Sequence, residues 1–419
     1  MRKLKCVSMF VLLALLLGAV VDSTLTSAES REIRWLVYTD PQYDFSVEYP
    51  ATWQVSPRNV QPGYVGGSVS FSQTQPGRVS ECGKPIYVKV EIGLYLEERE
   101  PSRSIVDWSE AYNTAGDIFA PGEVQIQDAR QVKLSGLADR EAFREAGVSP
   151  LTEFTYVNVP HGKTVWFIWM NSTDKEDMVF FDHIFDSLRF GSNTPTTLQE
   201  IYGQDYKSLS SRPTWEIKAV SHGLRSNQAP DAHIFSAARL LVPSNYQVPV
   251  GGPTRRYIAC GNLNAPVCGG THTGSAARAI DIGLPTGISV RNSARAYVNW
   301  VGWNTQGYGW LVMLQDTVHS YIAYYAHLSS INFANLSVQP IPQGLEIGLS
   351  GNSGGEALNP PVVYGPHLHF HVRTTGWAAV DLAGMPSLTL YSDPASSSYP
   401  NCGYTTCPGG FQCTCGRVY

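Results

Sequence analysis

Three histidines alternate with apolar residues in the segment GPHLHFHV, residues 365–372. Side chains two positions apart on a β-strand point to the same face. His367, His369 and His371 would therefore share one face, while Leu368 and Phe370 would pack on the other. Six of the ten histidines fall between His272 and His371. A strand of this kind can present neighbouring imidazoles to one metal ion.

Zinc is the metal that these residue types favour. It binds imidazole and carboxylate groups, and a catalytic zinc site uses three protein ligands and keeps a fourth position for water. The segment GTHTGSAARAIDIG supplies another histidine, His272, and a carboxylate, Asp281, ahead of a Pro-Thr-Gly turn. Bound zinc lowers the pKa of its water towards about 7 and polarises a carbonyl group. These histidines and the aspartate therefore predict a zinc site that catalyses hydrolysis.

Two further segments lie between these candidates. His327 ends an alternating run in YIAYYAHLSS, and GLSGNSGG, residues 348–355, supplies a tight turn before the histidine-rich strand. Neutral imidazoles beside the scissile bond can take a proton from water, stabilise the oxyanion and protonate the leaving amine. Such steps are typically worth about 10²–10⁴-fold in rate.

The order of these four segments resembles that of the lysostaphin-type (LytM-like) zinc metalloendopeptidase family. The resemblance implies that His272, Asp281 and His369 bind one Zn²⁺ per chain, and that His327 and His367 are catalytic. Eight residues separate His272 from Asp281, a longer loop that resembles the LasA and β-lytic branch. His371 stands where many relatives carry Glu, and it is expected to be either a partner of a ligand or a surface residue.

The elements that must position these residues are β-strands. Residues 229–395 are dense in Gly, aromatic and β-branched residues, which favours a mainly β catalytic domain. The resemblance implies antiparallel sheets that form an open groove.

The preceding segment, residues 33–190, alternates β-rich runs with turn residues. Strands are predicted at 44–49 and 86–96, a hairpin at 152–159 and 163–170, and a helix through Met178, Phe181, Ile184 and Leu188. The ends of this segment, YDFSVEYPATWQV and FFDHIFDSLRF, resemble PsbP-like domains. That resemblance implies an α+β sandwich, whose role would be substrate targeting or shielding of the active site.

The remaining segments have simpler interpretations. Residues 1–28 read as a secretory signal peptide, with a basic start and an apolar run at 9–21 that is shorter than the ~18 residues a membrane span needs. Residues 191–228 read as a linker with a short helix at 198–209. Residues 396–419 form a Cys-rich tail. The mature protein is expected outside the cytoplasm or at a cell wall, as a monomer.

Seven cysteines follow the signal segment. In an oxidising compartment they are expected to pair, with Cys260 and Cys268 closing a short loop and the tail cysteines forming a second system. A structural zinc in the tail is the less favoured alternative. Cys82 is left as a free thiol or as a partner of a tail cysteine. The seven are Cys82, Cys260, Cys268, Cys402, Cys407, Cys413 and Cys415.

Composition and resemblance together define the candidate functions. A net charge of −5 excludes binding of nucleic acid by phosphate neutralisation. The resemblance implies an endopeptidase that cuts peptidoglycan peptides. One alternative is a non-catalytic module that binds the wall or activates an amidase, and another is an endopeptidase for Gly-rich extracellular protein. The other histidines are interpreted as packing or surface residues: His161, His183, His222, His233 and His319.

Overall fold

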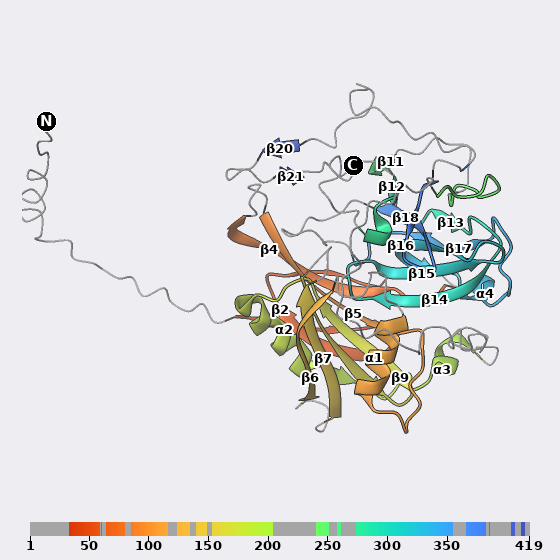
Figure 1. Ribbon diagram of the computed structural model, residues 1–419. Coiled ribbons are helices and arrows are strands. Elements are labelled where there is room, and N and C mark those ends of the chain that lie inside the picture. Colours follow the sequence, from red (N-terminus) through yellow and green to blue (C-terminus); the bar gives the residue numbers. More distant parts are fainter. Residues whose placement is uncertain are drawn as a thin grey trace, which may run out of the picture.

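The structure is a computed structural model (Figure 1). It describes residues 33–58, 60, 64–79, 85–115, 124–134, 140–148, 153–203, 240–250, 258–260, 274–354, 366–382, 385, 404–406 and 412–414. The expected signal peptide, the linker beyond residue 203, and His272 lie outside this part of the chain. The same holds for the side chains of all seven cysteines, so the disulfide predictions are untested. The part between residues 33 and 203 is called the first domain below, and the part between 240 and 385 the second domain.

The first domain is built on a seven-stranded antiparallel sheet in the order β3-β4-β5-β9-β8-β7-β6. Its central strand β9 is buried on both faces, which explains the apolar run VWFIWM that follows Thr164. Trp166 points into one core of this domain, whereas Phe167 and Trp169 point to the opposite side. The strands run Gln54–Ser56 (β3), Ser68–Val79 (β4), Pro85–Leu94 (β5), Gln125–Leu134 (β6), Arg140–Val148 (β7), Glu153–His161 (β8) and Thr164–Met170 (β9).

A small sheet and three helices complete this domain. The sheet has the order β1-β2-β10, with bounds Trp35–Thr39, Phe45–Pro50 and Arg189–Phe190. The helices are α1 (Ile105–Ala115), α2 (Lys175–Ser187) and α3 (Leu198–Tyr202). Asp174 caps α2 by accepting a hydrogen bond from the Glu176 N–H, and Phe181 and Ile184 are buried on its inner face. The predicted helix and the β8–β9 hairpin are confirmed. The helix expected at 198–209 begins at Leu198 and ends at Tyr202.

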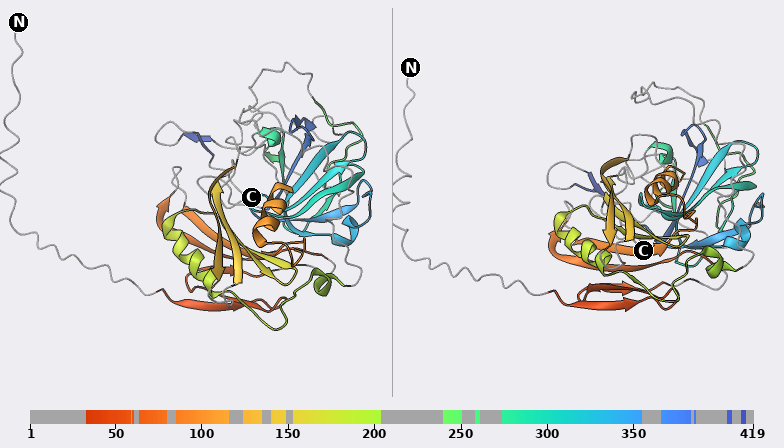
Figure 2. Two further views of the ribbon diagram at one scale, coloured as in Figure 1. Left: turned by 60° about the horizontal axis from the view of Figure 1, so that its bottom comes forward. Right: turned by 90° about the horizontal axis from the view of Figure 1, so that it is seen from below.

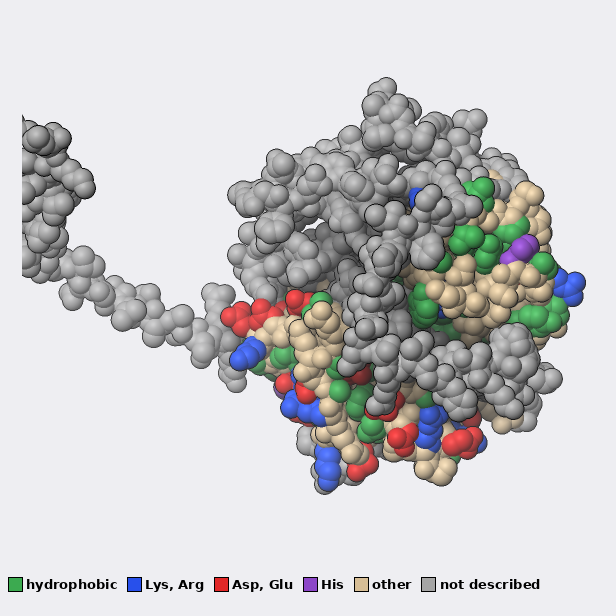
Figure 3. Space-filling view, in the orientation of Figure 1, with side chains coloured by type: hydrophobic (Ala, Val, Ile, Leu, Met, Phe, Trp, Pro, Cys, Tyr) green, Lys and Arg blue, Asp and Glu red, His purple; other side chains and the backbone are tan. Residues whose placement is uncertain are grey.

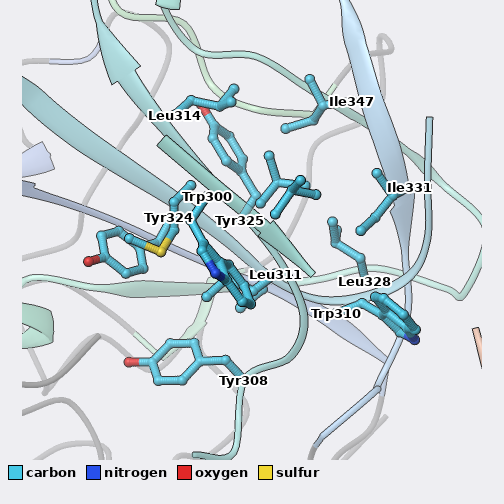
Figure 4. Close-up of a cluster of buried hydrophobic side chains, with 14 of the residues drawn as sticks. Trp300, Tyr308, Trp310, Leu311, Leu314, Tyr324, Tyr325, Leu328, Ile331 and Ile347 are labelled. Atoms are coloured by element: carbon cyan, nitrogen blue, oxygen red, sulfur yellow. The ribbon is translucent and has the colours of Figure 1, made fainter. Parts of the chain in front are cut away.

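The second domain is a nine-stranded antiparallel sheet whose main path is β11-β12-β18-β16-β15-β14. Figure 4 shows its packed interior, where Trp310 and Leu328 face each other across β15 and β16. The strands run Ile258–Cys260 (β11), Ile280–Gly283 (β12), Ser289–Arg291 (β13), Ala296–Asn304 (β14), Gly309–Asp316 (β15), Tyr321–Ile331 (β16), Glu346–Ser350 (β17), His367–Thr374 (β18) and Ala379–Val380 (β19). The short helices of this domain are Gly274–Ala276 (a 3-10 turn) and Phe333–Leu336 (α4). After this domain, Tyr404–Thr406 (β20) pairs with Gln412–Thr414 (β21).

The two domains share one buried aromatic cluster. Figure 2 shows α1 between the large sheet of the first domain and the sheet of the second. Phe167 stacks on Trp303 with ring centroids 4.5 Å apart. Val65 and Ile331 exchange two backbone hydrogen bonds of 2.9 Å. Each aromatic pair contributes about 0.5–1.5 kcal/mol beyond the burial of its surface, so the interface resembles a domain core.

The predicted fold class is confirmed: antiparallel sheets dominate both domains and helices are few. The boundaries 33–190 and 229–395 stay predictions. On the face shown in Figure 3, acidic and basic side chains lie intermixed over the first domain. Among the described residues, no helix is long and apolar enough to cross a membrane.

Candidate active site

Strand register places Asp281 beside the histidine-rich strand. β12 pairs antiparallel with β18, and Asp281 lies directly opposite His369. Cross-strand partners point to the same face, with Cβ atoms about 5 Å apart. As a result Asp281 Oδ1 lies 3.0 Å from His369 Nδ1 and 3.9 Å from His367 Nε2. The prediction that the alternating histidines share a face is confirmed for this strand.

His371 extends the same row away from Asp281. Its Nδ1 lies 2.9 Å from His369 Nε2, and its ring stacks on Tyr324 with centroids 4.1 Å apart. Register explains the stack, because Tyr324 lies opposite His371 on β16. His371 is fully buried, so of the two expectations for this residue the surface role is wrong. It is a partner of His369.

His327 reaches the histidine face through an irregular backbone. β16 does not end at His327 but continues to Ile331. Ala326 pairs with His369, so regular alternation would turn the next side chain to the opposite face. His327 instead has a φ of 60°, and the β15–β16 register shifts around it. A left-handed φ is uncommon for non-glycine residues and costs of order 1–3 kcal/mol. The observed ring therefore lies 4.6 Å from that of His367.

Two hydrogen bonds hold His327 in this conformation. Its N–H donates to the Tyr308 carbonyl over 2.9 Å, and its Nδ1 lies 2.9 Å from the Ser353 carbonyl oxygen. Since a carbonyl only accepts, Nδ1 carries the proton and Nε2 is left as the acceptor. Burial, followed by the neighbouring histidines, holds the pKa of His327 well below its ordinary value. The ring is therefore neutral at physiological pH.

Tyr308 and Ser353 also shape the site, although no sequence motif points to Tyr308. Its ring lies 4.9 Å from that of His369, nearly perpendicular at 88°, and Figure 4 shows it at the edge of the packed interior. The β14–β15 turn that carries Tyr308 touches the turn that carries Ser353, because the Trp310 N–H donates to Ser353 Oγ over 2.9 Å. The sequence of the Gly-rich segment predicts a turn, but it does not predict the contact of this turn with His327.

The donor set fits zinc, with one ligand still to be placed. Two ligands at ~2.0 Å from a tetrahedral zinc ion lie about 3.3 Å apart, close to the 3.0 Å between Asp281 Oδ1 and His369 Nδ1. Among the described residues, no group of three His, Cys, Asp or Glu side chains is arranged to hold a metal ion. His272, the third expected ligand, lies outside that part of the chain. The expected set of ligands and catalytic histidines therefore stays a prediction.

Residues 275–382 match the sequence model of peptidase family M23. The M23 segment contains Asp281, His327, His367 and His369 and begins after His272. It makes up well under half of the chain. The match indicates a peptidase, and no curated protein has a significant match to the sequence.

Solved structures resemble each domain separately. The catalytic domain of lysostaphin, an antimicrobial peptidase from Staphylococcus simulans, is 23% identical over 30% of this chain and 87% of its own, with a TM-score of 0.22. A mutant catalytic domain of the prophage-encoded M23 protein EnpA from Enterococcus faecalis is 24% identical over 32% and 94%, with a TM-score of 0.25. Cyanobacterial PsbP (CyanoP) from Synechocystis sp. PCC 6803 is 14% identical over 39% and 96%, with a TM-score of 0.26. At these values the structural likeness says nothing about activity.

Proposed function

We propose that the chain is a secreted zinc-dependent endopeptidase that hydrolyses peptide bonds of peptidoglycan, in a cross-bridge or a stem peptide. One observation carries the proposal: a carboxylate and four buried imidazoles gather on one sheet face within the M23 segment. The exposed fractions of His327, His367 and His369 are 4, 6 and 4%. Polar groups are buried in this way only when their partners repay the desolvation, and such clusters are frequent in active sites.

In this proposal the roles are those that the resemblance implies, and the positions of the His327 and His369 nitrogens support them. Asp281 and His369 would hold the metal together with His272, and the bound metal would lower the pKa of its water and polarise the scissile carbonyl. His327 has its Nδ1 proton engaged by Ser353, so its Nε2 can accept a proton from the attacking water. His367 lies beside His327, with ring centroids 4.6 Å apart, and it would stabilise the oxyanion or protonate the leaving amine.

Peptidoglycan digestion tests the proposal. Purified mature protein should release new amino termini from peptidoglycan, and a chelator should abolish the release. Equal release with and without the chelator, or no release at all, would reject a zinc peptidase acting on this substrate. If zinc is absent from the purified protein, the non-catalytic wall-binding function is favoured. Faster cleavage of a Gly-rich protein than of cell wall would favour the other alternative.

Two substitutions separate metal binding from proton transfer. His369→Ala should lose the zinc, whereas His327→Ala should keep it and lose about 10²–10⁴-fold in kcat. His183→Ala is the matched control, since His183 lies in the first domain on α2, paired with Glu48 at 2.7 Å. It should retain both zinc and activity. If His327→Ala loses zinc as completely as His369→Ala does, the division of roles is wrong.

A further inference from the structure

The catalytic face is bordered by two turns that are packed backbone to backbone. One is the β14–β15 turn, residues 305–308, and the other follows β17 at residues 351–354. A Cβ atom on Gly354, which has a φ of 65°, would lie 2.1 Å from the Gly309 nitrogen. Only glycine permits both this approach and this φ. Any displacement of one turn therefore displaces the other.

His327 depends on both turns. Its backbone N–H bonds to Tyr308 in the first turn, and its Nδ1 bonds to Ser353 in the second. A residue with a left-handed backbone keeps its conformation only when its surroundings over-determine it. The position of the His327 ring is therefore set by where the two turns are held.

The first domain contacts the β14–β15 turn through residues of β9. The Trp169 indole N–H donates to the Thr305 carbonyl over 3.0 Å, and both groups are buried. Phe167, two residues earlier on β9, stacks on Trp303 at an interplanar angle of 13°. Trp169, Trp303 and Phe167 are each 0–1% exposed. The turn thus rests on a rigid aromatic wall that belongs to the other domain.

The first domain also reaches the second turn. Glu91 on β5 is 2% exposed, and burial raises the pKa of its carboxyl, while Lys89 and the neighbouring Gly354 backbone oppose that rise. Lys89 completes the contact, with its Nζ 2.7 Å from Glu91 Oε1. The same sheet therefore bonds to the first turn through Trp169 and lies close to the second turn through Glu91.

We propose that the first domain is a positioning element for His327: through the hydrogen bond from Trp169 to Thr305, it holds the paired turns that direct this histidine towards His367 on β18. The catalytic consequence rests on the function proposed above, whereas the mechanical coupling does not. The coupling is a property of the intact chain and needs no substrate.

Hydrogen exchange in the intact protein tests the coupling. Trp169→Phe keeps an aromatic ring in the interface but removes the donor to Thr305. Trp166→Phe is the matched control, because Trp166 is equally buried on the same strand, faces the other core, and its Nε1 has no hydrogen-bond partner among the described residues. A net hydrogen bond of about 0.5–1.5 kcal/mol corresponds to up to roughly tenfold in an opening equilibrium. Exchange of the His327 and Trp310 amides should therefore be up to about tenfold faster in Trp169→Phe, and unchanged in the control.

Activity provides the second readout. Trp169→Phe should lower kcat by about tenfold with little change in KM and with full zinc content, since a small displacement of a catalytic group mainly costs turnover. Equal exchange in both variants would overturn the inference, whatever the activity. Faster exchange with unchanged kcat in an active protein would overturn the catalytic part. An inactive wild type with faster exchange in Trp169→Phe would reject the proposed function and leave the coupling standing. If Trp169→Phe does not fold, Phe167→Leu loosens the same turn through Trp303.

Discussion

Replacing His371 by alanine is expected to weaken zinc binding without unfolding the protein. When His369 gives Nδ1 to the metal, its proton must sit on Nε2, which lies 2.9 Å from His371 Nδ1. Alanine removes that acceptor and leaves a buried N–H unsatisfied, at a cost of about 1–3 kcal/mol. The metal-free protein escapes part of this cost because the proton can then move to Nδ1, which faces Asp281. Since 1.4 kcal/mol is a factor of ten, the zinc affinity should fall by about 10–100-fold.

Competition between the protein and a chromophoric zinc chelator measures this loss. His371→Asn is the informative comparison, because the Asn Oδ1 stands near the position of the His Nδ1 and can accept the same proton. Both variants lose the stack on Tyr324, which has centroids 4.1 Å apart, so both should melt at a lower temperature than the wild type. Only the alanine variant should bind zinc weakly. If alanine and asparagine bind zinc equally tightly, the hydrogen bond to His369 does not tune the metal site.

Two further predictions concern stability. Burial alone would raise the pKa of Asp316, but hydrogen bonds from the Tyr246 hydroxyl and from the backbone of the following turn outweigh burial and lower it below 3.8. Such a carboxylate stabilises the fold above pH 3.8, and its contribution is lost as the pH falls through the folded pKa. Tyr246→Phe should therefore cost about 1.5–3 kcal/mol in urea unfolding at neutral pH and clearly less near ~pH 2; equal losses at both would contradict this. Gly302→Ala would place a Cβ 1.9 Å from Tyr112 Oη and should cost about 1–3 kcal/mol. Adding Tyr112→Phe should recover part of that loss, and strictly additive losses would contradict the contact.

Local patterns in the sequence predicted much of the fold. The helix α2 follows from apolar residues at helical spacing, with Phe181 and Ile184 buried as expected. The β8–β9 hairpin follows from two β-rich runs around Pro160, His161 and Gly162. His319, interpreted as a packing or surface residue, lies in the turn after β15 and contacts Asp316 at 2.9 Å. These features depend on neighbours within a few residues, so the chain encodes them locally.

The sequence by itself also determined which side chains are available for catalysis: alternating histidines that share a face, and a carboxylate able to join them. Only the tertiary structure decided which groups meet. The pairing of Asp281 with His369 depends on the register of two strands far apart in the chain, and a slip of one residue would reverse the face. The face of the sheet on which His327 lies depends on its left-handed backbone. Regular alternation along the strand would predict the opposite face. Hydrogen bonds to the Tyr308 and Ser353 carbonyls hold that conformation, and the first domain contacts the turn that carries Tyr308. Interactions of this kind come from residues distant in the sequence, and no local pattern records them.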